Sequence, residues 1–283
     1  MSMNTALTTV LQDTSSTRIM GIINVTPDSF FDGGRYDSPG AAATHAARLA
    51  SDGAHILDVG GESSRPGAAP VSPDEELRRV MPAIEAAVAT GLPVSIDTYR
   101  AETARHALAA GAVMVNDITG LRGDDDMAGV VAEFNAFCVI MHMKGNPQTM
   151  QHNPEYKDVV GDIEAFFVER IACAHERGIT GERIWLDPGF GFGKTAQQNL
   201  ELLRRLDEFK KLGFPLLIGT SNKSTIGAVL NASPLERAYG TAATVALAIS
   251  KGVHCVRVHD VKAMAQVARM SDAALRGRII GNA

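Results

Sequence analysis

The stretch HILDVGGESSRPGAAPVSPDEELRRV (residues 55–80) contains one complete structural unit and decides the fold. Residues 55–60 form a mostly apolar run of strand length, and residues 61–71 carry neither a helical nor a strand pattern. Ser72, Pro73 and Glu75 then match a helix start, with a capping hydroxyl, a proline at the first helical position and a glutamate three residues after the cap. The stretch therefore predicts a strand, a long loop and a helix, in that order.

Seven further runs of strand length repeat this unit along the chain, and a helix-like stretch follows each of them. The runs are near-continuous rather than alternating in apolar character, which is typical of parallel strands covered on both faces. Eight such units in 283 residues predict a single-domain α/β fold, the (β/α)8 TIM barrel. Spacing alone leaves a doubly wound open sheet as the alternative. The expected strands cover 19–24, 55–60, 93–98, 112–117, 137–142, 183–188, 215–220 and 255–260, and helices are expected near 100–110, 125–135, 158–177, 197–211, 224–250 (with Pro234 as a candidate break) and 261–275.

Composition narrows the class of protein. The net charge is −5 with no basic block, so neither nucleic acid nor an anionic membrane is an expected partner, and no apolar run approaches the length of a membrane span. The three cysteines lie far apart and show no metal-site spacing, which indicates a reducing compartment and predicts a cytoplasmic protein. Residues 1–17 lack the basic and apolar parts of a signal peptide. We expect them to form a frayed tail, followed by the barrel over residues 18–283.

The stretch DPGFGFGKT (187–195) resembles a phosphate-binding loop only superficially. In a nucleotide-binding loop of the type GxxxxGK, the first glycine would fall on the position of Pro188. Gly191, Gly193 and Ala196 do fit the looser dinucleotide pattern, but that match alone is weak. The stretch therefore predicts no nucleotide site.

Polar residues stand at the ends of the expected strands. A single aspartate or asparagine there often only caps the next loop. In a barrel, however, all strand ends meet at one rim, which is where barrel enzymes keep their active sites. Carboxylates and amides at such a rim suit a flat heterocycle with adjacent N–H donors and a carbonyl group, and Asp97, Asn116 and Asp187 are the candidates. The strand ends read Asn24, Asp58, Asp97, Asn116, His142, Asp187, Thr220 and Arg257 to His259.

The last two strand ends indicate an anion site. GTSNKSTIG (219–227) carries Ser221, Lys223 and Ser224, and RVHD (257–260) carries Arg257 and His259. The loops after strands seven and eight are where barrels commonly bind phosphate. We therefore expect the anion of the substrate here.

Two long loops without regular pattern, 25–36 and 61–71, are predicted to be active-site lids. The first carries Phe30 and Phe31, and the second carries Arg65. Simple connecting loops need neither such aromatic side chains nor that arginine.

The motifs MGIINVTPDSFFDGG, DVGGESSRPGA, SIDT, VNDI, MHMKGNPQTMQ, DPGFGFGK, GTSNKSTIG and RVHDV together resemble those of dihydropteroate synthase, in the order of that family and over residues 19–275. The resemblance implies a barrel enzyme that joins 6-hydroxymethyl-7,8-dihydropterin diphosphate to p-aminobenzoate. Such an enzyme releases pyrophosphate and makes 7,8-dihydropteroate for folate synthesis. It uses Mg2+, is usually a homodimer, and is the target of sulfonamides.

The same resemblance implies roles for the matching positions. The pterin contacts are Asp97, Asn116, Asp187 and Lys223, and the walls of the pterin slot are Ile118, Met141 and Gly219. The diphosphate and Mg2+ groups are Asn24, Arg257 and His259, with Asn24 as the metal ligand; together with Lys223 they form the implied catalytic set. The p-aminobenzoate side is formed by Ser64, Arg65, Pro66, Phe192 and Ser224, with Phe30 closing over it and Ser64 also touching the pterin diphosphate.

Two positions depart from the family pattern. Ser64 replaces a threonine found in many members and keeps the hydroxyl group, whereas Asn222 stands where the family carries arginine, beside the expected site of the aryl carboxylate. Lys194 is expected to face solvent.

Two other functions remain as alternatives. A methyltetrahydrofolate methyltransferase has a similar barrel and pterin slot but no use for the diphosphate groups, and a non-catalytic pterin-binding paralogue is favoured only by Asn222.

Overall fold

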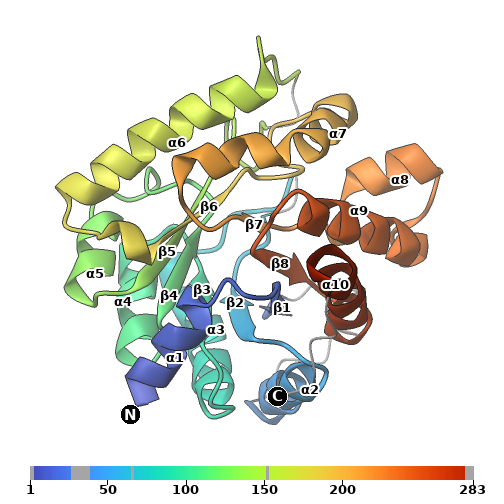
Figure 1. Ribbon diagram of the computed structural model, residues 1–283. Helices are drawn as coiled ribbons and strands as arrows, with labels where there is room; N and C mark the ends of the chain where they lie inside the picture. Colours follow the sequence, from blue (N-terminus) through green and yellow to red (C-terminus); the bar gives the residue numbers. More distant parts are fainter. Residues whose placement is uncertain (1–2, 27–38, 65–66, 151–152, 278–283) are drawn as a thin grey trace.

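The computed structural model describes residues 3–26, 39–64, 67–150 and 153–277 and shows a ring of parallel strands surrounded by helices (Figure 1). The strand order is β6-β5-β4-β3-β2-β1-β8-β7. The ring closes between β6 and β7, where Leu186 forms a parallel bridge with Leu216 and its N–H donates to the Pro215 carbonyl at 2.9 Å. The predicted barrel is therefore confirmed, and the open doubly wound sheet is excluded. The strands are β1 (Arg18–Asn24), β2 (Ile56–Gly60), β3 (Val94–Asp97), β4 (Met114–Asp117), β5 (Phe137–Met141), β6 (Ile184–Asp187), β7 (Leu217–Ile218) and β8 (Cys255–Val258).

The helices form the outer layer of the barrel (Figure 1). The α-helices are α1 (Met3–Gln12), α2 (Pro39–Ser51), α3 (Pro73–Val88), α4 (Ala101–Ala109), α5 (Met127–Glu133), α6 (Val159–Glu176), α7 (Ala196–Arg204), α8 (Ser224–Leu230), α9 (Ala238–Ser250) and α10 (Val261–Arg276), and the short 3-10 helices are η1 (Gly181–Arg183), η2 (Leu206–Leu212) and η3 (Pro234–Glu236).

The start of α3 follows the predicted signals only in part. Ser72 is the N-cap and accepts the Glu75 N–H at 3.3 Å, and proline occupies the first turn. The Glu75 carboxylate does not return to the cap, because it accepts from Arg78 and Arg79 at 2.7 Å each. The helix start is thus confirmed, but only one half of the capping box forms.

Two predicted helices are broken in the structure. The range 224–250 divides into α8, η3 and α9, because Asn231 adopts a left-handed conformation (φ 51°) at the end of α8 and Pro234 opens the 3-10 turn. The range 197–211 begins as α7 but continues after Arg204 as the 3-10 helix η2, which ends at Gly213 with φ 79°.

The interior of the barrel is filled by side chains from the strands together with Leu11 of α1, which is only 1% exposed. The expectation of a frayed tail is therefore wrong for residues 3–12, because burying this leucine holds α1 against the barrel interior. The interior cluster consists of Leu11, Met20, Ile56, Met114, Phe137, Val139, Trp185, Leu217 and Cys255. This apolar layer forms the floor below the polar strand ends.

Candidate active site

Arg257 of β8 links the carboxylates of Asp58 on β2 and Asp97 on β3. Its Nε donates to Asp58 and one Nη donates to Asp97, both at 2.6 Å. Asp58 is fully buried and also accepts from the Asn116 amide at 3.2 Å. The predicted residues Asp97, Asn116 and Arg257 therefore lie together, with Asp58 beneath them as their common anchor.

The two carboxyl groups predicted to bind the pterin have raised pKa values. Burial raises the pKa of Asp97 to about 7, although Arg257 opposes the shift. Burial likewise raises the pKa of Asp187 to about 6, opposed by the hydrogen bond from the Gly189 N–H and by the charge of Lys223. Perturbed carboxyl groups in a rim of this kind are typical of functional sites. A ligand with paired N–H donors would favour the ionised form of both.

An apolar wall stands beside the acids. The predicted residues Ile118, Met141 and Phe192 form one buried cluster, each less than 9% exposed. The Lys223 ammonium lies 4.0 Å from the centroid of the Phe192 ring. Lys223 is therefore positioned by a cation–π contact rather than exposed as an ordinary surface lysine. The cluster also contains Met143 and Met150, and Tyr99 packs against it.

The last two strand ends meet as predicted. The Ser221 hydroxyl lies 2.9 Å from Nδ1 of His259, and the His259 backbone N–H donates to the same hydroxyl at 3.3 Å. Gly219 lies beside Arg257, since a Cβ built on it would be 3.8 Å from the Arg257 Cβ. Ser224 begins α8 and is exposed, and Asn24 ends β1 half-buried.

The backbone explains why asparagine is tolerated at position 222. Asn222 has φ 58°, in the left-handed region where asparagine is among the least strained residues. Its N–H donates to the Thr241 hydroxyl at 3.2 Å, and its carbonyl accepts from Arg237 at 2.9 Å. These contacts fix the backbone of the 219–223 loop whatever side chain position 222 carries.

The expectation that Lys194 faces solvent is wrong. Lys194 is 2% exposed, and its ammonium donates to the carbonyls of Gly189 and Phe192 at 2.9 Å each. Gly189, Gly191 and Gly193 have φ values of 67°, 87° and 61°, so the chain turns back over the lysine. The glycine-rich stretch is thus a compact turn that closes on its own lysine.

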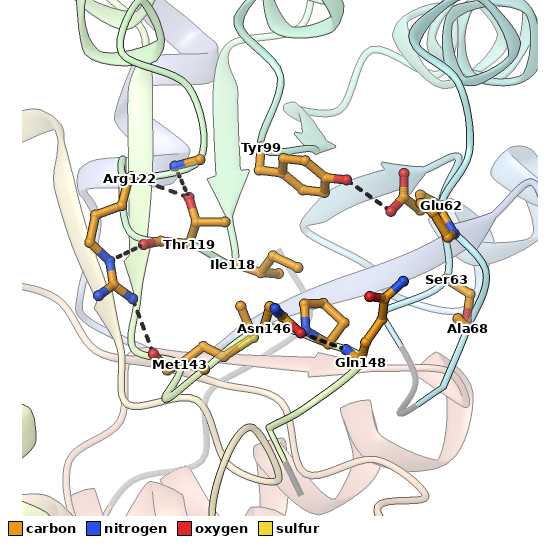
Figure 2. A pocket seen from close by; sticks show the side chains of 14 residues that line it. Glu62, Ser63, Ala68, Tyr99, Ile118, Thr119, Arg122, Met143, Asn146 and Gln148 are labelled. Carbon is orange, nitrogen blue, oxygen red and sulfur yellow. Dashed lines mark hydrogen bonds between the residues drawn. The ribbon is translucent and has the colours of Figure 1, made fainter. Parts of the chain in front are cut away.

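The base of the predicted second lid is held by buried charges. Glu62 pairs with Arg100 at 2.7 Å and accepts from the Tyr99 hydroxyl at 3.0 Å (Figure 2). Arg100 also pairs with the buried Glu76 at 2.7 Å. Residues 61–64 and 67–71 contain neither helix nor strand, as predicted.

A cavity of about 530 Å³ opens between this loop and the loops after β3, β4 and β5 (Figure 2). Ile118 lines the cavity together with Tyr99, Arg122, Met143 and Asn146. The cavity therefore adjoins the apolar wall through Ile118. Arg122 is held at its edge by bonds to the carbonyls of Thr119 (2.9 Å) and Met143 (3.1 Å).

Several predicted residues lie outside the described part of the chain. They are Phe30, Arg65 and Pro66, and most of the predicted first lid lies outside it too. Ser64 is described and is half-buried.

Within the described ranges, no group of three or more histidine, cysteine or acidic residues is arranged to hold a metal ion. Over the same ranges, no helix combines the length and apolar character that crossing a bilayer requires.

Sequence reasoning missed three residues that position the site. The sequence showed Asp58 only as a residue at a strand end. Its role depends on Asn116 and Arg257, which lie 58 and 199 residues further along the chain. Asn199 of α7 accepts from the Gly191 N–H at 2.7 Å and donates to the Thr225 hydroxyl at 3.1 Å, and no local pattern marks it. Lys194 could have been suspected only from its place after three glycines that favour a tight turn.

The carboxyl ends of the barrel strands carry two acids, an amide and an arginine beside an aromatic wall. This arrangement is typical of a barrel enzyme that binds a flat polar heterocycle. Residues 20–259 match the model of the family described as pterin binding enzyme. The dihydropteroate synthase of Synechocystis is 50% identical over 262 residues, which cover 92% of this chain and 91% of that protein. The chain therefore belongs to the pterin binding enzyme family, in its dihydropteroate synthase branch.

Two solved structures agree with this assignment. A dihydropteroate synthase from Clostridium difficile, crystallised in the presence of pteroic acid, has a TM-score of 0.86 and 49% identity, covering 92% of this chain and 97% of that chain. The dihydropteroate synthase of Yersinia pestis, in complex with a sulfonamide drug, has a TM-score of 0.89 and 42% identity, covering 93% and 95%.

Proposed function

We propose that this protein is a dihydropteroate synthase. It condenses 6-hydroxymethyl-7,8-dihydropterin diphosphate with p-aminobenzoate, giving 7,8-dihydropteroate and pyrophosphate. The observation that carries the proposal is the joint position of Asp97, Asn116 and Asp187 beside the Phe192 wall and the cations Lys223 and Arg257. The family relationship supports the same reaction.

The carboxylates and the amide bind the pterin. Asp97 and Asp187 accept N–H donors from the edge of the heterocycle, and Asn116 can donate and accept at once. Ile118, Met141 and Gly219 form the walls of the slot. Binding shifts both carboxyl groups toward ionisation, because a hydrogen bond to the charged form favours that form.

The chemistry needs no nucleophile from the protein. The bond from the methylene carbon of the pterin to the diphosphate oxygen breaks ahead of attack, and the electron-rich pterin delocalises the positive charge that develops on that carbon. The aniline nitrogen of p-aminobenzoate, which is neutral at pH 7, then bonds to the carbon and loses its proton to solvent. Lys223, Arg257 and His259 stabilise the negative charge that builds on the leaving diphosphate. The contact of Ser221 with Nδ1 orients the imidazole ring of His259.

The aryl substrate lies against Phe192, with Ser64 and Ser224 available to its carboxylate. Arg65 and Pro66 belong to the same side in this proposal, and Phe30 covers it. Sulfonamides, which the Yersinia pestis relative binds, would compete for this position.

Mg2+ completes the proposal as the metal of the diphosphate. Magnesium is usually held by one or two protein ligands, water and substrate phosphates rather than by a dedicated protein cage. Asn24 fits that mode as a single amide ligand, since it ends β1 and is half-buried. Asn24 would hold the ion, which supplies positive charge to the leaving group.

The assay that tests the function is steady-state pyrophosphate release from the pterin diphosphate, with p-aminobenzoate and Mg2+ present or omitted. We expect release only when both substrates are present. A protein that binds the pterin diphosphate but releases no pyrophosphate would instead be a non-catalytic paralogue.

The homodimer is also part of the proposal. Leu235 and Tyr239 are 83% and 89% exposed, and the neighbouring Val229 of α8 is 57% exposed. Leu235 lies in η3, between α8 and α9, and the helices α8, α9 and α10, which carry Val229, Tyr239 and other exposed apolar side chains, lie side by side (Figure 1). A large exposed apolar patch on one face is typical of a protein–protein interface.

Sedimentation equilibrium tests the dimer. We expect the mass of a dimer for the natural chain and of a monomer for Val229→Glu. The control is Val168→Glu on α6, at a valine of similar exposure (55%) on another face. An unchanged mass for Val229→Glu would place the interface elsewhere.

A cytoplasmic location completes the proposal. Cys138, Cys173 and Cys255 are all unpaired, as expected in a reducing compartment. Recovery of the protein from the periplasmic fraction of its host would contradict this location.

A further inference from the structure

Lys194 is a buried amine within the glycine-rich loop, and burial lowers its pKa to about 7. Besides the carbonyls of Gly189 and Phe192, its ammonium lies 3.0 Å from Nδ1 of His142. Burial, with the nearby charge of Lys194, lowers the pKa of His142 to about 2, so its ring is neutral, and Nδ1 accepts in the tautomer that carries the proton on Nε2. The three N–H groups of the ammonium form thus have three acceptors within 3.0 Å and a fourth, the His142 carbonyl, at 3.5 Å, which is the condition under which a buried ammonium is tolerated.

The loop around Lys194 packs closely against the chain that follows β5. A Cβ on Gly189 would lie 1.9 Å from the His142 carbonyl oxygen, and a Cβ on Gly193 would lie 2.4 Å from that of Lys144. The loop therefore packs backbone against backbone on the chain after β5. The Tyr156 hydroxyl adds one outer tether, donating to the Gly193 carbonyl at 2.7 Å.

Phe192 connects this loop to the aryl side of the site. Its carbonyl is bound by the Lys194 ammonium, and its ring carries the Lys223 ammonium at 4.0 Å. Lys223 also packs against the loop itself, since a Cβ on Gly191 would be 3.1 Å from the Lys223 Cδ. A shift of the Phe192 backbone would therefore move both the ring and the cation that rests on it.

We propose that Lys194 is a positioning residue that holds Phe192 in place for the aryl substrate. The inference rests on the proposed function, because it concerns the site of p-aminobenzoate. It predicts an asymmetric effect on the two substrates. Asp187 keeps its 2.7 Å bond from the Gly189 N–H, and Asp97 keeps its 2.6 Å bond from Arg257, so the pterin side is less dependent on Lys194.

The test compares Lys194→Met with the natural enzyme. Methionine keeps the length and volume of the side chain but removes all three donors. A displaced Phe192 is expected to raise the KM for p-aminobenzoate roughly tenfold or more, and to change the KM for the pterin diphosphate less than about threefold. Lys194→Arg, which restores charge and donors, should recover part of the lost p-aminobenzoate affinity.

Leu203→Ala is the control for general instability. Leu203 of α7 is buried in the apolar core outside the barrel interior. It should lower the denaturation midpoint without separating the two KM values. Equal effects of Lys194→Met on both KM values, or no effect on either, would overturn the inference.

A second variant and a second measurement cover the case in which Lys194→Met folds poorly. Tyr156→Phe removes only the outer tether of the loop and should raise the KM for p-aminobenzoate in the same direction, by a smaller factor; an unchanged value would count against the inference. Hydrogen exchange at the amides of residues 190–193 should speed up in both variants. A natural protein that releases no pyrophosphate would overturn the proposed function, and the exchange data would still decide whether Lys194 holds the loop.

Discussion

Replacing Asp97 by asparagine is expected to weaken binding of the pterin diphosphate at least tenfold. One Asp97 oxygen accepts from Arg257 at 2.6 Å, so the other oxygen remains to accept an N–H donor of the pterin. Asparagine must turn its NH2 group toward one of these two donors, which leaves buried donors facing each other. The side chain is 17% exposed, so water compensates little of this loss.

The magnitude follows from the charge of the acceptor. A hydrogen bond to a charged group contributes about 1.5–3 kcal/mol, and about 1.4 kcal/mol corresponds to a factor of ten. We therefore expect a loss of roughly ten- to a hundredfold in affinity. The variant should still fold, because Arg257 keeps its 2.6 Å bond to Asp58.

Isothermal titration calorimetry with the pterin diphosphate measures the effect directly. Asp125→Asn is the matched control, since it removes the same charge at an exposed position between β4 and α5. Its affinity should equal that of the natural protein. An unchanged dissociation constant for Asp97→Asn, with the circular dichroism spectrum also unchanged, would remove Asp97 from the pterin site.

Two further predictions concern pH and position 222. Because the pKa values of Asp187 and Asp97 are raised to about 6 and about 7, both groups are partly protonated in the free protein near neutral pH, and N–H donors favour their ionised form. The affinity for the pterin should therefore rise as the pH increases through this range, and binding should release protons. Calorimetry in buffers of different ionisation enthalpy measures the proton release, and a binding heat that is the same in all of them would contradict the prediction. Asn222→Arg should lower the KM for p-aminobenzoate several-fold and leave the KM for the pterin diphosphate unchanged. The same substitution should reduce the free energy of unfolding by about 1 kcal/mol, because arginine is less tolerant than asparagine of the left-handed backbone at this position. Kinetics with each substrate varied in turn and urea denaturation check both parts, and a parallel shift of both KM values would place position 222 at the diphosphate instead.

The sequence alone determined the order of strands and helices and the rim on which the polar groups meet. Strands covered on both faces are apolar throughout, so runs such as 55–60 and 137–142 could be recognised without knowledge of their neighbours. Because all strands of a parallel barrel end at one face, it followed that Asp97, Asn116, Asp187 and Arg257 share that face. The roles of individual residues came from the resemblance to a family rather than from any pattern in the chain.

Only the tertiary structure decided which side chains contact one another and which are buried. Arg257 binds Asp58 and Asp97 across 199 and 160 residues of sequence, and no local pattern specifies a partner at that distance. Lys194 was misjudged for the same reason, since an isolated lysine is normally exposed and its acceptors are created by the turn that buries it. Leu11 is likewise buried only because the closed barrel offers an apolar end to α1. Local sequence encodes the conformation of a segment, whereas burial and hydrogen bonding depend on what the rest of the chain places around it.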